Sequence, residues 1–304
     1  MAITAKDVQA LREMTGVGMM DCKKALTEAE GNMDKAVEIL REKGLAASQK
    51  KAGRIAAEGM AYAAVVDGVG VVVEVNAETD FVGKNEKFVD FVKGVAAVVA
   101  KEKPADLDAL MAAPYGNGRT VQEEQQEMVL VIGENIKIRR FAFFVDGVSV
   151  PYIHAGGKIG VLVNLDTDLA PEQVAEVGKD MAMQIAALNP RFLDKSEVDE
   201  ATLEEEKKIL LVQMENDPKM AAKPDKVKQG IVTGKLRKFY EENCLLQQEF
   251  VKDNSMSVEQ YVAKVAKERG GSIKLKAAVR FEKGEGIEKN QENFAEEIAK
   301  QLAK

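Results

Sequence analysis

The stretch from residue 60 to residue 81, MAYAAVVDGVGVVVEVNAETDF, decides the fold because its apolar residues follow the period of strands. It predicts two strands joined by a tight turn at Asp67-Gly68, since this pair tolerates the left-handed backbone of a two-residue hairpin turn. The second strand, Val71 to Val75, is rich in valine and is expected at the centre of a sheet. The helix expected after it buries four positions: Phe88, Phe91, Val92 and Val95.

Residues 141–188 repeat this plan, which indicates an internal duplication. Three features of the first copy recur in the second: the turn VDGV at 145–148, Val75-Asn76 as Val163-Asn164, and Thr79-Asp80 as Thr167-Asp168. We interpret the repeat as a strand–strand–helix unit, with the segment SVPYIHAGG as an addition in the second copy. Two such units side by side predict an α+β fold with helices packed on antiparallel sheets.

The segment before this core has the pattern of three short helices, over 4–16, 19–31 and 32–44. Thr4 and Asp7 have the spacing of a capping box at the start of the first helix. Gly44 is expected to end the third helix, because glycine is the common residue just past a helix C-terminus. The basic stretch after Gly44 is either a linker or a connecting helix.

Residues 196–243 carry two charged helical patterns and predict a projecting helical hairpin. Its narrow apolar seam places Leu203, Leu210 and Met214 opposite Val227, Ile231 and Leu236. An amphipathic helix at the C-terminus is expected to bury Phe294, Ile298 and Leu302. The predicted divisions are 1–55 for the three-helix domain and linker, 56–142 for the first core subdomain, 143–285 for the second with the hairpin inserted at about 196–243, and 286–304 for the C-terminal helix.

The composition excludes several classes of function. The net charge of −7 argues against broad nucleic-acid binding. The sequence has no apolar run of membrane-spanning length and no signal peptide, so we expect a cytoplasmic protein. Cys22 and Cys244 lie too far apart in sequence to indicate a disulfide framework, and the single histidine, His154, rules out a His-pair zinc site. We therefore predict a protein without metal or cofactor that is not an enzyme.

One aromatic residue lies where the chain should turn in water. Phe81 stands between the polar pair Thr79-Asp80 and the hydrophilic segment 83–86. Because a Thr-Asp pair precedes the helix in both copies, the pair is predicted to cap that helix. Phe81 then has two interpretations: it packs back on its own helix as a hydrophobic staple, or it is an apolar anchor that only a partner protein can bury.

Five stretches together resemble bacterial elongation factor Ts, in order along nearly the whole chain: TGVGMMDCKKALTEAEGNMDKAVEILR (15–41), VNAETDFVGKNEKF (75–88), IGENIKIRR (132–140), YIHAGGKIGVLV (152–163) and RFEKGEGIEK (280–289). The resemblance implies a guanine nucleotide exchange factor that promotes exchange of GDP for GTP on elongation factor Tu without covalent chemistry. It also implies a ubiquitin-associated-like three-helix head, a two-part core, an inserted coiled-coil hairpin and a C-terminal helix.

The resemblance further implies which residues contact elongation factor Tu. The family's signature TDFV corresponds to Thr79, Asp80, Phe81 and Val82, with Asp80 and Phe81 entering the GTPase domain beside its magnesium and phosphate site. The other implied contact residues are Met19, Met20, Lys23, Ile132, Gly133, His154 and Val251. Lys252 is polar where the family often has an apolar residue, which departs from the family's pattern beside Val251.

The main alternative is an adaptor or chaperone module that merely displays a ubiquitin-associated-like head. Such a module does not need an aromatic wedge at Phe81, whereas an exchange factor does. An enzyme, the third reading, would show turnover with no partner protein present. The expected partner is elongation factor Tu, either GDP-bound or nucleotide-free, with no membrane and no direct nucleic-acid contact. The hairpin could also support a homodimer.

Overall fold

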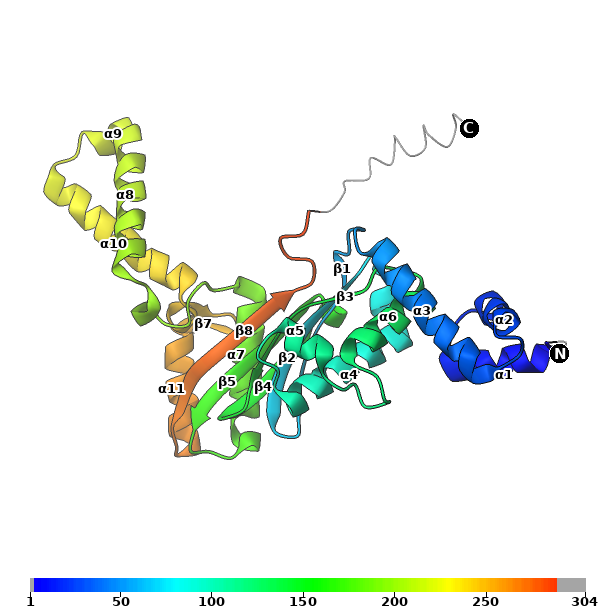
Figure 1. Cartoon of the computed structure of the whole chain (residues 1–304). Coiled ribbons are helices and arrows are strands. Elements are labelled where there is room, and N and C mark those ends of the chain that lie inside the picture. The colour runs from blue at the N-terminus through cyan, green and yellow to red at the C-terminus, as the bar shows by residue number, and fades with distance from the viewer. Residues whose placement is uncertain (1–2, 289–304) are drawn as a thin grey trace.

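The computed structural model of the chain describes residues 3–288, arranged as shown in Figure 1. Three N-terminal helices pack around a small apolar core that includes Leu11, Leu26 and Leu40: α1 (Ala5–Thr15), α2 (Met19–Glu28) and α3 (Met33–Lys51). The predicted capping box at α1 is confirmed. The Asp7 carboxylate accepts the Thr4 N–H at 2.9 Å, and the Thr4 hydroxyl oxygen accepts the Asp7 N–H at 3.3 Å.

The prediction that Gly44 ends the third helix is wrong, because α3 continues to Lys51. Gly44 is buried where α3 meets α6 (Val121–Ile132). A Cβ atom on Gly44 would lie 3.4 Å from the carbonyl oxygen of Gln126 in α6. The glycine therefore allows two helices to approach closely, and the basic stretch after it begins as a connecting helix.

Two three-stranded antiparallel sheets form the centre of the molecule. The first has the order β1 (Glu58–Val66), β2 (Val69–Ala77) and β3 (Lys137–Phe144), and the second has the order β4 (Val148–His154), β5 (Ile159–Thr167) and β8 (Ile273–Glu282). The predicted hairpin is confirmed: Asp67 and Gly68, at φ +49° and +80°, join β1 to β2. β2 is the middle strand, as its valines indicate.

The sheets pack face to face, and helices cover their outer faces (Figure 1). Apolar side chains from both sheets meet between them: Ala61, Ala63, Val72, Leu162 and Phe281. The outer face of the first sheet carries α4 (Glu86–Glu102), α5 (Leu107–Ala112) and α6. The outer face of the second carries α7 (Pro171–Leu188) and α11 (Val258–Arg269). The four positions predicted to be buried on α4 are buried.

The duplication is present, but the sequence alignment of its two turns is wrong. The VDGV segment at 145–148 does not close a hairpin; it carries the chain from β3 in the first sheet to β4 in the second. The hairpin that corresponds to β1–β2 is β4–β5, so SVPYIHAGG supplies a strand and its turn, not an addition. The two turns differ because the second crosses between the sheets; there Asp146 pairs with Lys276 of β8 and does not take the left-handed backbone of Asp67.

The matched asparagines of the two copies do play one role. Asn76 is buried in β2 and donates its side-chain amide to the Glu58 carbonyl at 3.1 Å. Asn164 is buried in β5 and donates to the Asp146 carbonyl at 2.8 Å. In each copy the asparagine thus ties the middle strand to the chain at or just before the start of the preceding strand.

A buried carboxylate joins the two halves. Glu74 in β2 is 0% exposed and accepts from Arg139 at 3.0 Å, Arg140 at 2.5 Å, the Gly284 N–H at 2.8 Å and Asn76 at 3.1 Å. Consecutive residues of a strand normally point to opposite faces. A bulge in the pairing of β2 with β3 lies at this point and allows both arginines to reach one carboxylate. Gly284 follows β8, so the site closes the first sheet against the end of the second.

Residues 200–243 form a projecting pair of long helices, α8 (Glu200–Asn216) and α10 (Asp225–Asn243), with the short α9 (Pro218–Ala221) between them (Figure 1). Leu210 and Met214 are buried in their seam as predicted. The prediction for Val227 is wrong, because its side chain is 44% exposed and Val232 fills the seam in its place. The end of α10 is tied to the segment that precedes α8, because the Arg191 and Phe192 N–H groups donate to the Asn243 carbonyl at 2.9 Å and 3.1 Å.

The remaining elements are short. They are the strands β6 (Glu249–Phe250) and β7 (Asp253–Ser257) and the 3₁₀ turns η1 (Val82–Lys84), η2 (Ala155–Gly157), η3 (Lys195–Glu197) and η4 (Leu245–Gln247). The predicted C-terminal helix, with Phe294, Ile298 and Leu302, lies outside the described residues. Within residues 3–288, no helix is long and apolar enough to cross a membrane.

Candidate partner-binding site

The loop after β2 presents an aromatic side chain to solvent. Phe81 is 80% exposed, more than any other large apolar side chain in residues 3–288. Asp80 beside it is also exposed and makes no hydrogen bond to the described residues, while Val82 is buried. The hydrophobic-staple interpretation of Phe81 is therefore wrong, because a staple would bury the ring against α4.

Thr79 and Asp80 do not cap the next helix, so the predicted capping role is wrong. Asn85 caps α4: its side-chain oxygen accepts the N–H groups of Lys87 at 3.0 Å and Phe88 at 3.4 Å. The turn η1 separates the Thr-Asp pair from the helix by several residues. The pair is therefore too far from the first turn of α4 to satisfy its free N–H groups.

Two glycines, Gly83 and Gly59, allow the exposed loop to pack closely against β1. A Cβ atom on Gly83 would lie 2.8 Å from the carbonyl oxygen of Gly59. Gly59 itself has φ +107°, and a Cβ there would lie 2.2 Å from the carbonyl oxygen of Val75. Two backbones thus meet with no room for side chains, which fixes η1 on β1 while Phe81 points outward.

The predicted contact residues Ile132 and Gly133 lie beside this loop. Gly133 ends α6 in the left-handed conformation, with φ +85°. The next residue, Glu134, accepts both the Thr79 N–H and the Thr79 hydroxyl, at 2.9 Å and 2.7 Å. The structure therefore brings the TDFV segment and the end of α6 together, although they are more than fifty residues apart in sequence.

Met19, Met20 and Lys23 lie on α2 and are exposed, with Met19 at 45% and Met20 at 64%. The three-helix segment touches the beginning of α4, because Lys87 donates its ammonium to the Gly16 carbonyl at 3.3 Å. A shallow cleft at this contact is lined by both Met19 and Lys87. The start of α2 therefore stands close to the start of α4, which follows the Phe81 loop.

His154 is exposed at the end of β4, and its Nδ1 lies 3.0 Å from the Tyr152 hydroxyl. The turn after it rests on β1, since a Cβ on Gly157 would lie 2.7 Å from Cγ of Met60. Met60 follows Gly59, the residue that supports η1. His154 and the Phe81 loop are thus both attached to the start of β1.

Val251 is exposed in the turn between β6 and β7 and belongs to the second half of the molecule. Its N–H donates to the Gln184 side chain in α7 at 2.9 Å. The neighbouring Lys252 forms an ion pair with Asp180 at 2.6 Å, so its ammonium has a partner within the chain. The structure does not bring Val251 together with the other predicted contact residues.

Sequence reasoning missed the residues that surround the loop. Ile55 is 41% exposed, and Arg54 next to it lies 3.4 Å from the carboxylate of Glu78. Glu134 lies within the stretch IGENIKIRR, but its residue type alone does not distinguish it from the many surface glutamates. The signal that could have found it is its position directly after Gly133, at the end of a helix already implicated.

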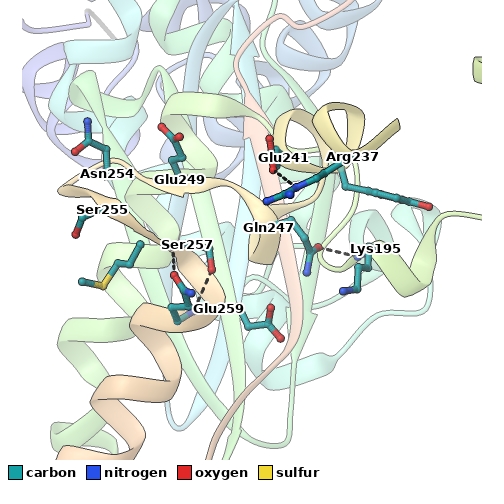
Figure 2. A pocket seen from close by; sticks show the side chains of 12 residues that line it. Lys195, Arg237, Glu241, Gln247, Glu249, Asn254, Ser255, Ser257 and Glu259 are labelled. Atoms are coloured by element: carbon teal, nitrogen blue, oxygen red, sulfur yellow. Dashed lines mark hydrogen bonds and ion pairs between the residues drawn. The ribbon is translucent and has the colours of Figure 1, made fainter. Parts of the chain in front are cut away.

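A polar hollow at the foot of the helical pair lies apart from this site (Figure 2). Its side chains engage one another: Arg237 donates to Glu241 at 3.0 Å, and the Gln247 side chain accepts the Lys195 N–H at 2.9 Å. None of the predicted contact residues lines it.

In the described part of the chain, no group of three or more His, Cys, Asp or Glu side chains is arranged to hold a metal ion. Cys22 and Cys244 are buried and unpaired, and burial raises the pKa of the Cys244 thiol to about 11.

Known proteins resemble this chain over its full length. The sequence profile of the family described as Elongation factor TS matches residues 78–285. A protein named Elongation factor Ts from Clostridioides difficile (strain 630) is 50% identical over 303 residues, covering 99% of both chains. The one from Clostridium botulinum (strain Eklund 17B) is 48% identical over 306 residues, covering 99% of this chain and 100% of the relative. The one from Syntrophotalea carbinolica is 49% identical over 303 residues, covering 98% and 99%. The chain belongs to the elongation factor Ts family.

Proposed function

We propose that this translation elongation factor binds elongation factor Tu in the cytoplasm and promotes release of GDP and rebinding of GTP. The observation that carries the proposal is the 80% exposure of Phe81 on a loop fixed by Gly59 and Gly83. Burying a phenylalanine side chain contributes roughly 1.5–3 kcal/mol. Because residues 3–288 leave the ring exposed, a partner that buries it gains this energy.

The proposed mechanism is a coupling between two ligands of one partner. Phe81 enters the GTPase domain beside the magnesium and phosphate site, into a pocket that forms only when the nucleotide-binding loops are displaced. The burial energy then favours the nucleotide-free state, and nucleotide that rebinds expels the factor by the same coupling free energy. No bond is made or broken in the factor, so no catalytic residue, cofactor or metal is required.

The other predicted residues have supporting roles in this proposal. Ile132 and Gly133 extend the contact beside Thr79, Asp80 and Phe81. A list of more remote contacts completes the interface: Met19, Met20 and Lys23 on the three-helix head, His154 at the end of β4, and Val251 in the second half. The exposure of Met19, Met20 and Val251 supports these assignments.

We also propose a division of the chain by role. Residues 1–55 form a ubiquitin-associated-like head, 56–142 the subdomain that carries the wedge, 143–285 the second subdomain with the coiled-coil hairpin, and 286–304 a C-terminal helix. The hairpin would serve self-association. Exposed apolar side chains on its helices support such a contact: Ile209, Leu211, Val212 and Val227.

The test is stopped-flow release of a fluorescent GDP analogue from purified elongation factor Tu. The wild-type chain should accelerate release, and Phe81→Ala should reduce the acceleration by about 10- to 100-fold, the range of the burial energy above. Leu188→Ala is the matched control, because Leu188 is also an exposed apolar residue, at 49%, but ends α7 in the other half. Release by Phe81→Ala as fast as by wild type, with unchanged circular dichroism, would remove the wedge, and a wild-type chain that does not accelerate release would favour the adaptor alternative.

A further inference from the structure

The loop that carries Phe81 and the loop after α6 exchange carboxylate–amide hydrogen bonds. The Glu134 carboxylate accepts the Thr79 N–H at 2.9 Å, and the Glu78 carboxylate accepts the Asn135 N–H at 2.6 Å. Each loop thus supplies one carboxylate and one backbone donor to the other. We call Glu78, Thr79, Glu134 and Asn135 the carboxylate clamp.

The clamp acts on the backbone just before the wedge. Glu134 accepts the Thr79 hydroxyl as well as its N–H, at 2.7 Å, so it fixes both the main chain and the side-chain rotamer of that residue. Hydrogen bonds to an ionised carboxylate are about twice as strong as those between neutral groups. Since Phe81 is 80% exposed, contacts of its own ring do not hold the loop, and its direction depends on the residues on either side.

A second set of contacts connects the clamp to the three-helix segment. Lys51, at the end of α3, donates its ammonium to the Gly133 carbonyl at 2.6 Å. The Arg54 carbonyl accepts the Asn135 side-chain amide at 2.8 Å, and the Arg54 guanidinium lies 3.4 Å from Glu78. The segment between α3 and β1 therefore contacts the clamp through Lys51 and Arg54, and these contacts support both loops of the clamp.

The second copy of the unit holds its corresponding loop in another way. The Asp168 carboxylate accepts the Ser272 N–H at 2.7 Å, and the Thr167 hydroxyl donates to the Ser272 carbonyl at 2.6 Å. There the Thr-Asp pair fixes its own loop and Leu169 packs inward. In the first copy Asp80 makes no such bond to the described residues. The loop is held instead by Glu134, which follows α6 and accepts the N–H and hydroxyl of Thr79.

We propose that Glu134, with Glu78, is a positioning residue for nucleotide exchange: it holds Thr79 so that Phe81 is presented in the orientation that enters the partner. This inference rests on the proposed exchange function. Orientation matters because a displacement of about 1 Å in a positioned group can cost on the order of 100-fold in rate.

The test compares Glu134→Ala, Glu134→Gln and Phe81→Ala in the GDP-release assay with the full chain. Glu134→Ala should lower the maximal release rate about tenfold, with little change in the concentration of factor that gives half the maximal effect. Glu134→Gln keeps one acceptor oxygen for Thr79 and should restore part of the rate. The double variant with Phe81→Ala should be no slower than Phe81→Ala alone, because Glu134 acts through Phe81.

Asp168→Ala is the matched control, since it releases the corresponding loop of the second copy and should leave the release rate unchanged. Hydrogen exchange of the free protein gives a readout that does not need the partner: the Thr79 amide should lose protection in Glu134→Ala and keep it in Asp168→Ala. Full release activity of a folded Glu134→Ala protein, while Phe81→Ala is slow, would overturn the positioning role and leave the proposed function intact. A Phe81→Ala protein as fast as wild type would overturn the wedge and with it the positioning role, whereas a wild-type chain that does not accelerate GDP release would overturn the exchange function itself.

Discussion

The first and second copies of the duplicated unit end their middle strands in the same sequence pattern and use it in opposite ways. After β5, Leu169 packs on the core of the second half, and Asp168 binds Ser272. After β2, Phe81 remains 80% exposed, and its loop is held by Glu134 from the end of α6. The comparison teaches that a duplicated scaffold can pack the apolar residue of one junction on its core and leave that of the other exposed.

The copies also differ inside the sandwich. Glu74 precedes Val75-Asn76 in β2, and Leu162 precedes Val163-Asn164 at the same place in β5. Glu74 holds two arginines and a backbone N–H, whereas the described neighbours of Leu162 between the sheets are apolar. One copy therefore closes the interface by a charge network and the other by packing.

Replacing each of these two residues by the one found in the other copy should cause the largest loss in the free energy of unfolding. Leu162→Glu buries a carboxylate among apolar side chains without an arginine partner, and we expect a loss of more than about 4 kcal/mol in the free energy of unfolding. Glu74→Leu removes the acceptor of two partly exposed arginines and the Gly284 N–H, and should cost about 3 kcal/mol. Urea unfolding followed by circular dichroism measures both. A Glu74→Leu protein as stable as wild type would show that the hydrogen bonds and ion pairs of Glu74 make no net contribution to stability.

The next largest effect should be on how the free energy of unfolding depends on pH, because the first copy has the buried carboxylate Glu74 where the second has Leu162. Burial raises the pKa of Glu74, but hydrogen bonds from Gly284, Arg140, Asn76 and Arg139 outweigh it and hold that pKa below 4.5. Because the folded pKa is lowered, Glu74 stabilises the protein fully above pH 4.5, and this contribution is lost as pH falls through the folded value. Wild type should therefore exceed Glu74→Gln in unfolding free energy at pH 7, and the difference should shrink below pH 4.5. A constant difference between pH 7 and pH 3 would contradict this assignment.

The two junction residues should separate stability from exchange. Leu169→Ala removes part of a half-buried side chain that packs on the second core, so it should cost about 1–2 kcal/mol in the free energy of unfolding. Phe81→Ala should leave that free energy within about 0.5 kcal/mol of wild type, because the ring is exposed. The pair is measured by urea unfolding and GDP release on the same preparations. If Leu169→Ala slows release at a temperature where it is fully folded, the division of roles between the junctions fails.

The smallest effects should come from the two aspartates. Hydrogen bonds from the Ser272 N–H and hydroxyl lower the pKa of Asp168, so Asp168→Asn should slightly lower the thermal midpoint at pH 7. Asp80→Asn loses no bond to the described residues and should leave the midpoint unchanged. Differential scanning calorimetry of both variants decides the order. A larger shift in thermal midpoint for Asp80→Asn than for Asp168→Asn would mean that the first junction contributes to the stability of the fold.

The sequence predicted features that depend on neighbouring residues. The Asp67-Gly68 turn, the central position of β2 and the buried face of α4 follow from local backbone preference and apolar period. The exposed Phe81 was identified because an aromatic residue in a polar turn is out of place. The role of Thr79-Asp80 was misread as a cap, since capping depends on where the helix starts, and η1 delays that start to Glu86.

Features set by distant contacts were not predictable in the same way. Gly44 looks like a helix end, yet its neighbour across the contact is Gln126 of α6. The VDGV segments have identical sequences but different backbones, because one closes the hairpin of β1 and β2 and the other crosses from β3 in the first sheet to β4 in the second. The clamp between Glu134 and Thr79 joins residues whose proximity only the fold creates. In each case the deciding partner lies far along the chain.

The hydrogen bond from the Gly284 N–H to Glu74 has a consequence for the order in which the fold is completed during synthesis. The first sheet is finished when Phe144 has emerged, and both arginines of Glu74 are present by then. The last donor, the Gly284 N–H, belongs to a residue synthesised on the order of ten seconds later at ordinary elongation rates. A nascent chain halted before Gly284 therefore has an unfinished polar centre. The hydrogen bonds of Glu74 are complete only once residue 284 has been added.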